Sequence, residues 1–216
     1  MRSIGLKAFS FIAVLTLAAL ACAIPSVSSI MNPKPHDDFS SDSTGWGTGD
    51  DSSSLVEYAN SGLHMLVYTP FYVTWSNQGL KSFENVHIEV SAKNDSKDPQ
   101  SLFGIVCDEQ GSTQSFYYAG ISSNGYYAII KSAVAQKDVF LKEGTSDVVS
   151  AISGPARLGM DCGGGSLALY VNGQKIADAS DSTYTSGVIG LFTASDDVNS
   201  GAEVTFDDYV VTKLGE

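Results

Sequence analysis

Short runs of Val, Ile, Tyr and Phe, separated by Gly, Ser, Asn and Asp, repeat along this chain from about residue 36 to its end. Side chains of a strand alternate between the two faces of a sheet, and such punctuated runs are typical of antiparallel β structure. Beyond the first 21 residues, no run shows the 3.6-residue period of an amphipathic helix. The runs indicate about a dozen strands, which is too many for one open sheet. We therefore predict an all-β fold, an antiparallel two-sheet jelly-roll sandwich.

Most of these strands are single runs, and two hairpins supply the rest. The single runs cover 62–68, 72–76, 86–93, 102–107, 138–143, 156–162, 187–194 and 203–214. The first hairpin, "SLALYVNGQKIADA", turns at Asn172-Gly173, where a two-residue type I′ turn needs positive φ angles. This turn predicts that Val171 lies opposite Gln174 and Leu169 opposite Ile176.

The second hairpin, "SFYYAGISSNGYYAIIKS", contains another Asn-Gly pair at residues 124–125. The same type of turn would put Ile121 opposite Ala128 and Tyr118 opposite Lys131. Ile121 and Ala128 would then face the core. Tyr118, Tyr127 and Lys131 would form an outward face.

The first 22 residues have the layout of a secretory signal. Arg2 and Lys7 precede an apolar run at 8–21, and Cys22 follows at a small-residue cleavage position. "ALAC" resembles the bacterial lipobox, which implies a signal peptide at 1–21 and two acyl chains on Cys22, enough for stable membrane attachment. The alternatives are ordinary secretion or a leader thiol without a role. Residues 22–35 indicate a flexible tether, and residues 36–216 a single domain.

The charge is strongly acidic. The formal net charge is −12, and removal of the two basic residues of the leader makes it more negative. This argues against nucleic acid as a partner and against binding to anionic lipid headgroups. The acidic residues are scattered in loops, where they keep an exported domain soluble, and some are candidates for structural Ca²⁺.

Cys107 and Cys162 are the last residues of two predicted strands. Each lies two positions after an apolar residue, Ile105 or Met160, and therefore on the same face of its strand. Both thiols should therefore point inward. In an oxidising compartment, with Cys22 acylated, they form the remaining pair for a disulfide. The alternative is two separate buried thiols that act as small apolar groups.

Several stretches together resemble a known family: "DDFSSDSTGW", "FYYAGISSNGYYAIIK", "ARLGMDCGGGSLALYVNGQKIAD", "SGVIGLFTASDD" and "VTFDDYVV". They resemble the concanavalin A-like lectin/glucanase sandwich. More closely, they resemble the laminin-G-like and 3-keto-disaccharide-hydrolase-type domains of bacterial exported lipoproteins. The resemblance implies that the first and last strands lie together, with residues 37–39 near 206–208.

Asp208 has the parity of Val204, Phe206 and Val210, so a regular strand would push its carboxylate into the core. A buried carboxylate must be paired or hydrogen-bonded. We rank three explanations in this order: hydrogen bonds from the opening loop, a β-bulge that turns Asp208 outward, and a Ca²⁺ ion shared with Asp38.

No catalytic constellation is recognised. Glycoside hydrolysis needs two carboxylates flanking the bond, and Glu89 in the run 86–93 has no acidic partner at the right spacing. The three histidines, His36, His64 and His87, are too widely spaced to indicate a zinc site.

Aromatic side chains that stack on sugar rings are therefore the strongest functional signal. The candidate ligand-binding residues are Tyr118, Tyr127, Lys131 and Trp75. The predicted function is a non-catalytic carbohydrate-binding lipoprotein on the outer face of the cell membrane or envelope. One alternative is a cell-envelope scaffold that binds a protein partner. The other is a glycoside-processing enzyme of the 3-keto-disaccharide hydrolase type.

Overall fold

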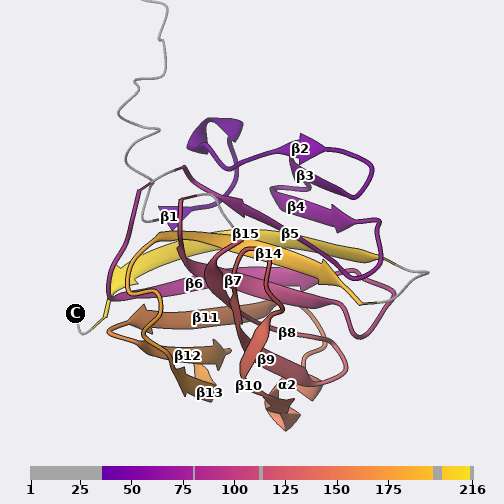
Figure 1. The fold of residues 1–216 in the computed structure, drawn as a ribbon. Helices are drawn as coiled ribbons and strands as arrows, with labels where there is room; N and C mark the ends of the chain where they lie inside the picture. The colour runs from indigo at the N-terminus through magenta and orange to yellow at the C-terminus, as the bar shows by residue number, and fades with distance from the viewer. Residues whose placement is uncertain (1–35, 80, 112–113, 197–200, 215–216) are drawn as a thin grey trace, which may run out of the picture.

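The protein is a sandwich of two antiparallel sheets (Figure 1). The computed structural model describes residues 36–79, 81–111, 114–196 and 201–214. Strands make up 59% of it and helices 4%, which confirms the predicted all-β jelly roll. The helical turns are η1 (Asp42–Thr44) and α2 (Asp147–Ser150).

The larger sheet has nine strands. Its order is β13-β12-β11-β6-β15-β4-β3-β2, and β1 also pairs with β15. The bounds are β1 (His36–Asp37), β2 (Gly49–Asp50), β3 (Ser54–Ala59), β4 (Gly62–Val67), β6 (Val86–Asn94), β11 (Ala156–Gly163), β12 (Ser166–Val171), β13 (Gln174–Ser180) and β15 (Ala202–Lys213).

The smaller sheet has six strands in the order β10-β9-β8-β7-β14-β5. The bounds are β5 (Tyr72–Asn77), β7 (Leu102–Glu109), β8 (Phe116–Ile121), β9 (Tyr126–Ser132), β10 (Val139–Thr145) and β14 (Val188–Ser195).

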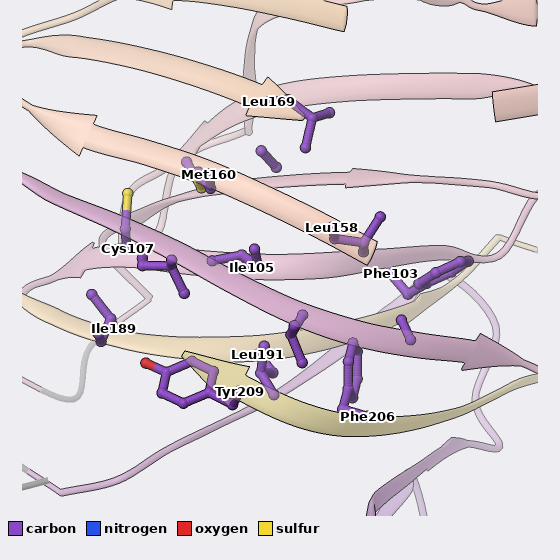
Figure 2. Packing of buried hydrophobic residues seen from close by; sticks show 14 of the residues in the cluster. Phe103, Ile105, Cys107, Leu158, Met160, Leu169, Ile189, Leu191, Phe206 and Tyr209 are labelled. Carbon is purple, nitrogen blue, oxygen red and sulfur yellow. The ribbon is translucent and has the colours of Figure 1, made fainter. Parts of the chain in front are cut away.

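The main core fills the space between the two sheets. Figure 2 shows Phe103, Ile105 and Leu191 of the smaller sheet and Leu158 and Phe206 of the larger one within one cluster. All five side chains are almost completely buried. Burying a large apolar side chain contributes about 1.5–3 kcal/mol, so this interface is the main source of stability.

A disulfide bond joins the two sheets. Cys107 of β7 and Cys162 of β11 are bonded, their Cα atoms are 6.6 Å apart, and both are fully buried. The inward parity predicted for both cysteines is confirmed, and so is the predicted bridge.

The hairpin at Asn172-Gly173 has the predicted turn. Both residues have positive φ angles, and Val171 lies opposite Gln174. Further along, a bulge shifts the register, so that Leu169 pairs with Ala177. The predicted pairing of Leu169 with Ile176 is therefore wrong, because one extra residue of β13 is accommodated beyond the turn.

The other hairpin is shifted by one residue from the prediction. Tyr118 pairs with Ile130, and Ile121 pairs with Tyr127. Gly125 has a φ of +94°, and its N–H donates to the carbonyl of Ser122. This is a three-residue loop with glycine in the left-handed position, which replaces the predicted two-residue turn. A shift of one residue moves every side chain of one strand to the opposite face.

The first and last strands lie together, as the family resemblance implies. β1 pairs with β15, with Asp37 opposite Tyr209. The register of β15 shifts between Asp207 and Val210, and Asp208 has a φ of +51° and is exposed. The β-bulge, ranked second, thus explains how Asp208 avoids the core. The explanation ranked first, hydrogen bonds from the opening loop to a buried carboxylate, is wrong.

A second strained acidic residue, Asp108, lies at a bulge of β7 and has a φ of +54°. It is buried beside the disulfide. Burial, and then the charge of Glu84, raise the pKa of Asp108 to about 6. The folded state therefore holds this proton more tightly than the unfolded state does. Stability should fall as the pH rises from about 4 through 6.

We expect Asp108→Asn to be more stable than the wild type at pH 7 by about 1–2 kcal/mol, because asparagine carries no charge and tolerates the left-handed region. At pH 4 the two proteins should unfold alike. Urea unfolding at both pH values tests this. An equal difference at both would show that the charge of Asp108 is irrelevant.

The expected signal peptide, the lipidation site Cys22 and the tether at 22–35 lie outside the described residues. In the part of the chain that is described, no helix is long and apolar enough to cross a membrane.

Candidate functional site

The outward face of the six-stranded sheet carries a second apolar cluster, separate from the main core. Four of its aromatic members form a row: the ring centroids of Trp75 and Phe116 are 5.2 Å apart, those of Phe116 and Tyr118 5.7 Å, and those of Tyr118 and Phe192 5.0 Å. Alternation along β8 and β14 explains this for Phe116, Tyr118 and Phe192, because the adjacent residues Tyr117, Ala119 and Leu191 fill the main core. We call Trp75, Phe116, Tyr118 and Phe192 the aromatic row.

A groove of about 430 Å³ lies over this face. Every strand of the smaller sheet contributes to it, so the groove crosses the strands. Its lining residues are Phe71, Val73, Gln100, Leu102, Tyr118, Ser122, Asn124, Tyr126, Ile130, Phe140, Ala194, Ser195 and Asp196. The surface is thus largely apolar and aromatic, with a few amide, hydroxyl and carboxylate groups. Sites for small molecules have this composition.

Two exposed phenylalanines come from opposite edges of the sheet. Phe71 precedes β5 and is 74% exposed, and Phe140 lies on β10 and is 52% exposed. Phe71 follows Pro70 and has a φ of +53°, in the left-handed region that is costly for an aromatic residue. Backbone strain of this kind is concentrated at functional sites. It is found here at an exposed ring that lines the groove.

Two tyrosines of the groove are held by carboxylates. The Tyr118 hydroxyl donates to Asp138, and the Tyr126 hydroxyl donates to Glu143. Burial and then the carboxylate hydrogen bond raise the pKa of both hydroxyls well above the usual value. Asp196 adds to this effect at Tyr126. Both tyrosines therefore remain neutral and orient their rings firmly across neutral pH.

Trp75 lies on the same face but does not line the groove. Its indole N–H donates to Glu109, and the Asn77 amide donates to the other oxygen of that carboxylate. Trp75 and Asn77 border a separate polar hollow of about 370 Å³ beside β2. The sequence-based candidate Trp75 is thus a member of the aromatic row that lies outside the groove.

Of the four candidates, Tyr118 lies in the groove, whereas Tyr127 and Lys131 face the other way. Tyr127 packs against the main core. Lys131 binds Asp181 at 2.6 Å and Thr183 at 3.0 Å. The predicted outward face of Tyr118, Tyr127 and Lys131 is wrong, because the register is shifted by one residue. Tyr126, which the shift brings to the groove, was missed.

Glu89 and His87 lie in a network of polar contacts of the nine-stranded sheet, whereas His64 contacts Glu57 and Glu203 of the same sheet. His87 lies 2.6 Å from Asp161, which accepts from Tyr170, and Glu89 pairs with Arg157. Burial opposes ionisation of Glu89, but hydrogen bonds from His87 and Arg157 lower its pKa overall. These groups satisfy one another, and none of them lines the groove or the polar hollow beside β2.

Asp38 and Asp208, the candidates for Ca²⁺, each have other partners. Asp38 accepts from the backbone and hydroxyl of Ser40, whereas Asp208 binds His36 and Arg157. Among the described residues, one group of three potential metal ligands lies within 4.8 Å, namely Cys107, Asp108 and Cys162. Its two sulfurs are bonded to each other. Calcium binding by Asp38 and Asp208 stays a prediction.

Comparison with known proteins agrees with this architecture. No protein-family model matches the chain, and no curated protein matches it. Among solved structures, it is similar to the carbohydrate-binding module CBM66 from Bacillus subtilis, with 13% identity and a TM-score of 0.64 over 78% of this chain and 96% of that one. The fold is therefore a concanavalin A-like jelly roll.

Two further similar structures have other descriptions. One is a protein of unknown function with a galectin-like fold from Bacillus subtilis, at 13% identity and a TM-score of 0.59 over 82% of this chain and 94% of that one. The other is a GH16 protein from a mixed-linkage glucan locus of Bacteroides ovatus, in complex with a product. It has 16% identity and a TM-score of 0.54 over 82% of this chain and 99% of that one. At these identities, the similarity establishes the fold alone.

Proposed function

We propose that this protein is an exported, lipid-anchored, non-catalytic carbohydrate-binding protein that holds glycan chains in the groove of the six-stranded sheet. The observation that carries the proposal is the groove itself, with Phe71, Phe140 and Tyr126 along an open hollow. Rings of this kind stack on the apolar faces of sugars, and neighbouring polar groups fix the orientation. Carbohydrate-binding modules and glycoside hydrolases among the similar structures support this choice.

The distribution of carboxylates favours binding over hydrolysis. The middle strands β7, β8 and β14 contribute Leu102, Tyr118 and Ala194 to the groove floor. Among the described carboxylates around the groove, Asp138 and Glu143 are hydrogen-bonded to tyrosine hydroxyls, which leaves Asp196 in the lining without such a bond to a tyrosine. A glycosidase needs two carboxylates on either side of the bond that it cleaves.

A pair of adjacent tyrosines tests the site. Tyr126→Ala should weaken binding to the glycan that binds most tightly on an array by at least about tenfold, because it removes a groove wall. Tyr127→Ala changes the next residue on the same strand, which faces the main core, and should leave the affinity unchanged once folding is verified by circular dichroism. Isothermal titration gives both affinities.

Equal losses in the two variants would argue against this groove as the site, and binding to no glycan would contradict the function itself. In that case a protein partner on the same face becomes the better explanation. Release of reducing sugar from a bound oligosaccharide would instead indicate an enzyme.

A further inference from the structure

The charge around the groove has one sign. Asp196 lines it, and Asp138 and Glu143 bind the tyrosine hydroxyls at its floor and wall. None of these three carboxylates forms an ion pair with a described residue. No lysine or arginine occurs among the residues that line the groove.

A bulge in β10 contributes Glu143 to this charge. The register shifts between Phe140 and Lys142, so that Phe140 pairs with Ile130 and Glu143 pairs with Ala128. Ile130 and Ala128 both belong to the outward cluster, which puts Phe140 and Glu143 on the groove face. Lys142 pairs with Ile129, which faces the main core. In a regular strand, Lys142 would follow Phe140 on the groove face, because side chains alternate.

The carboxylates would act strongly on an anionic ligand. Like charges 4 Å apart repel by about 4 kcal/mol at the effective dielectric constant near a protein surface. A ligand with carboxylate or sulfate groups would also lose its hydration without gaining a cationic partner. The hydroxyl groups of an uncharged sugar can instead donate to the free lone pairs of these carboxylates.

Building on the proposed function, we infer that the groove binds uncharged glycans and excludes glycans that carry carboxylate or sulfate groups. Asp138, Glu143 and Asp196 determine this specificity. The β10 bulge is the structural device that puts a glutamate where a regular strand would put a lysine.

Matched pairs of polysaccharides test the inference: hydroxyethyl-cellulose against carboxymethyl-cellulose, and methyl-esterified polygalacturonate against polygalacturonate. Affinity electrophoresis and titration at low salt should give at least about tenfold weaker binding for the anionic member of the pair that binds. At 0.5 M salt the difference should shrink, because the screening length falls below the groove's dimensions. Glu143→Gln, which keeps a hydrogen-bond acceptor for Tyr126, should reduce the difference in affinity between the two polysaccharides even at low salt.

The control is Glu57→Gln, the same chemical change on β3 of the other sheet, and it should leave the difference unchanged. Equal binding of both members of a pair, or a difference that Glu143→Gln leaves intact, would overturn the inference while the proposed function stands. Binding of anionic glycans alone would likewise overturn only the inference. If no glycan, charged or uncharged, binds on the array or in these pairs, both the proposed function and the inference fail.

Discussion

We expect the double variant Cys107→Ala/Cys162→Ala to be about 4 kcal/mol less stable than the wild type. The bond closes a segment with a sequence separation of 55 and joins the two sheets. Without it, the unfolded chain regains the entropy of that open loop, which gives this magnitude in the chain-entropy model. Both positions are fully buried, and alanine introduces no polar group there.

Guanidinium unfolding with and without dithiothreitol checks this result. Reductant should lower the midpoint of the wild type toward that of the double variant and should leave the variant's midpoint unchanged. A wild-type midpoint that does not respond to reductant, in a sample shown by mass spectrometry to be fully reduced, would show that the bond contributes nothing.

The second large effect is expected for Asp37→Ala. Asp37 is buried, and its carboxylate accepts hydrogen bonds from the Trp46 indole at 2.9 Å, the Gln78 amide at 2.8 Å and the backbone of Phe39 at 3.0 Å. Removing this acceptor leaves buried donors unpaired. Breaking such a buried charged network costs about 3–5 kcal/mol.

The adjacent Asp38 provides the matched control. It is exposed and, among the described residues, accepts hydrogen bonds from Ser40 in a local turn, so Asp38→Ala should cost less than about 1 kcal/mol. Thermal and chemical unfolding of both variants give the comparison. Similar losses at the two positions would mean that the network around Asp37 does not hold the amino-terminal segment in place.

The alternation of apolar and polar residues in the sequence was sufficient to predict the architecture and the disulfide bond. Ile105 and Cys107, or Met160 and Cys162, face inward because the core selects one parity of each strand. The strand at Ser54–Ala59 was not predicted. Its turn, Asn60-Ser61, has positive φ angles without a glycine, so the usual turn signal is missing.

The candidate site was predicted only in part, and the reason lies in one loop. Both Asn-Gly pairs have the composition of a type I′ turn, but Asn172 has a positive φ and Asn124 does not. The N–H of Asn124 instead donates to the carbonyl of Pro99, a contact with a distant segment that local sequence does not reveal. The groove thus receives Tyr126 where the sequence indicated Tyr127.

Bulges explain most of the remaining differences. At Asp208 and at Leu141, an extra residue changes which side chains share a face. The alternation of side chains predicts which face of the sheet a residue occupies only where the strand pairing is not interrupted by a bulge. The sequence alone does not indicate that the rings of Phe71 and Phe140 are exposed. Their exposure depends on how the edges of the folded sheet are arranged.

The pairing of β1 has a practical consequence for protein production. β4 pairs with β15 at residues 202–206, and β1 pairs with it at residues 209–210, so two short segments together cover one edge of the last strand. A truncated form beginning after Phe39 would leave unsatisfied backbone groups beside Tyr209, and uncovered strand edges promote self-association. Recombinant forms that start at or before His36 should stay monodisperse, whereas shorter ones should aggregate.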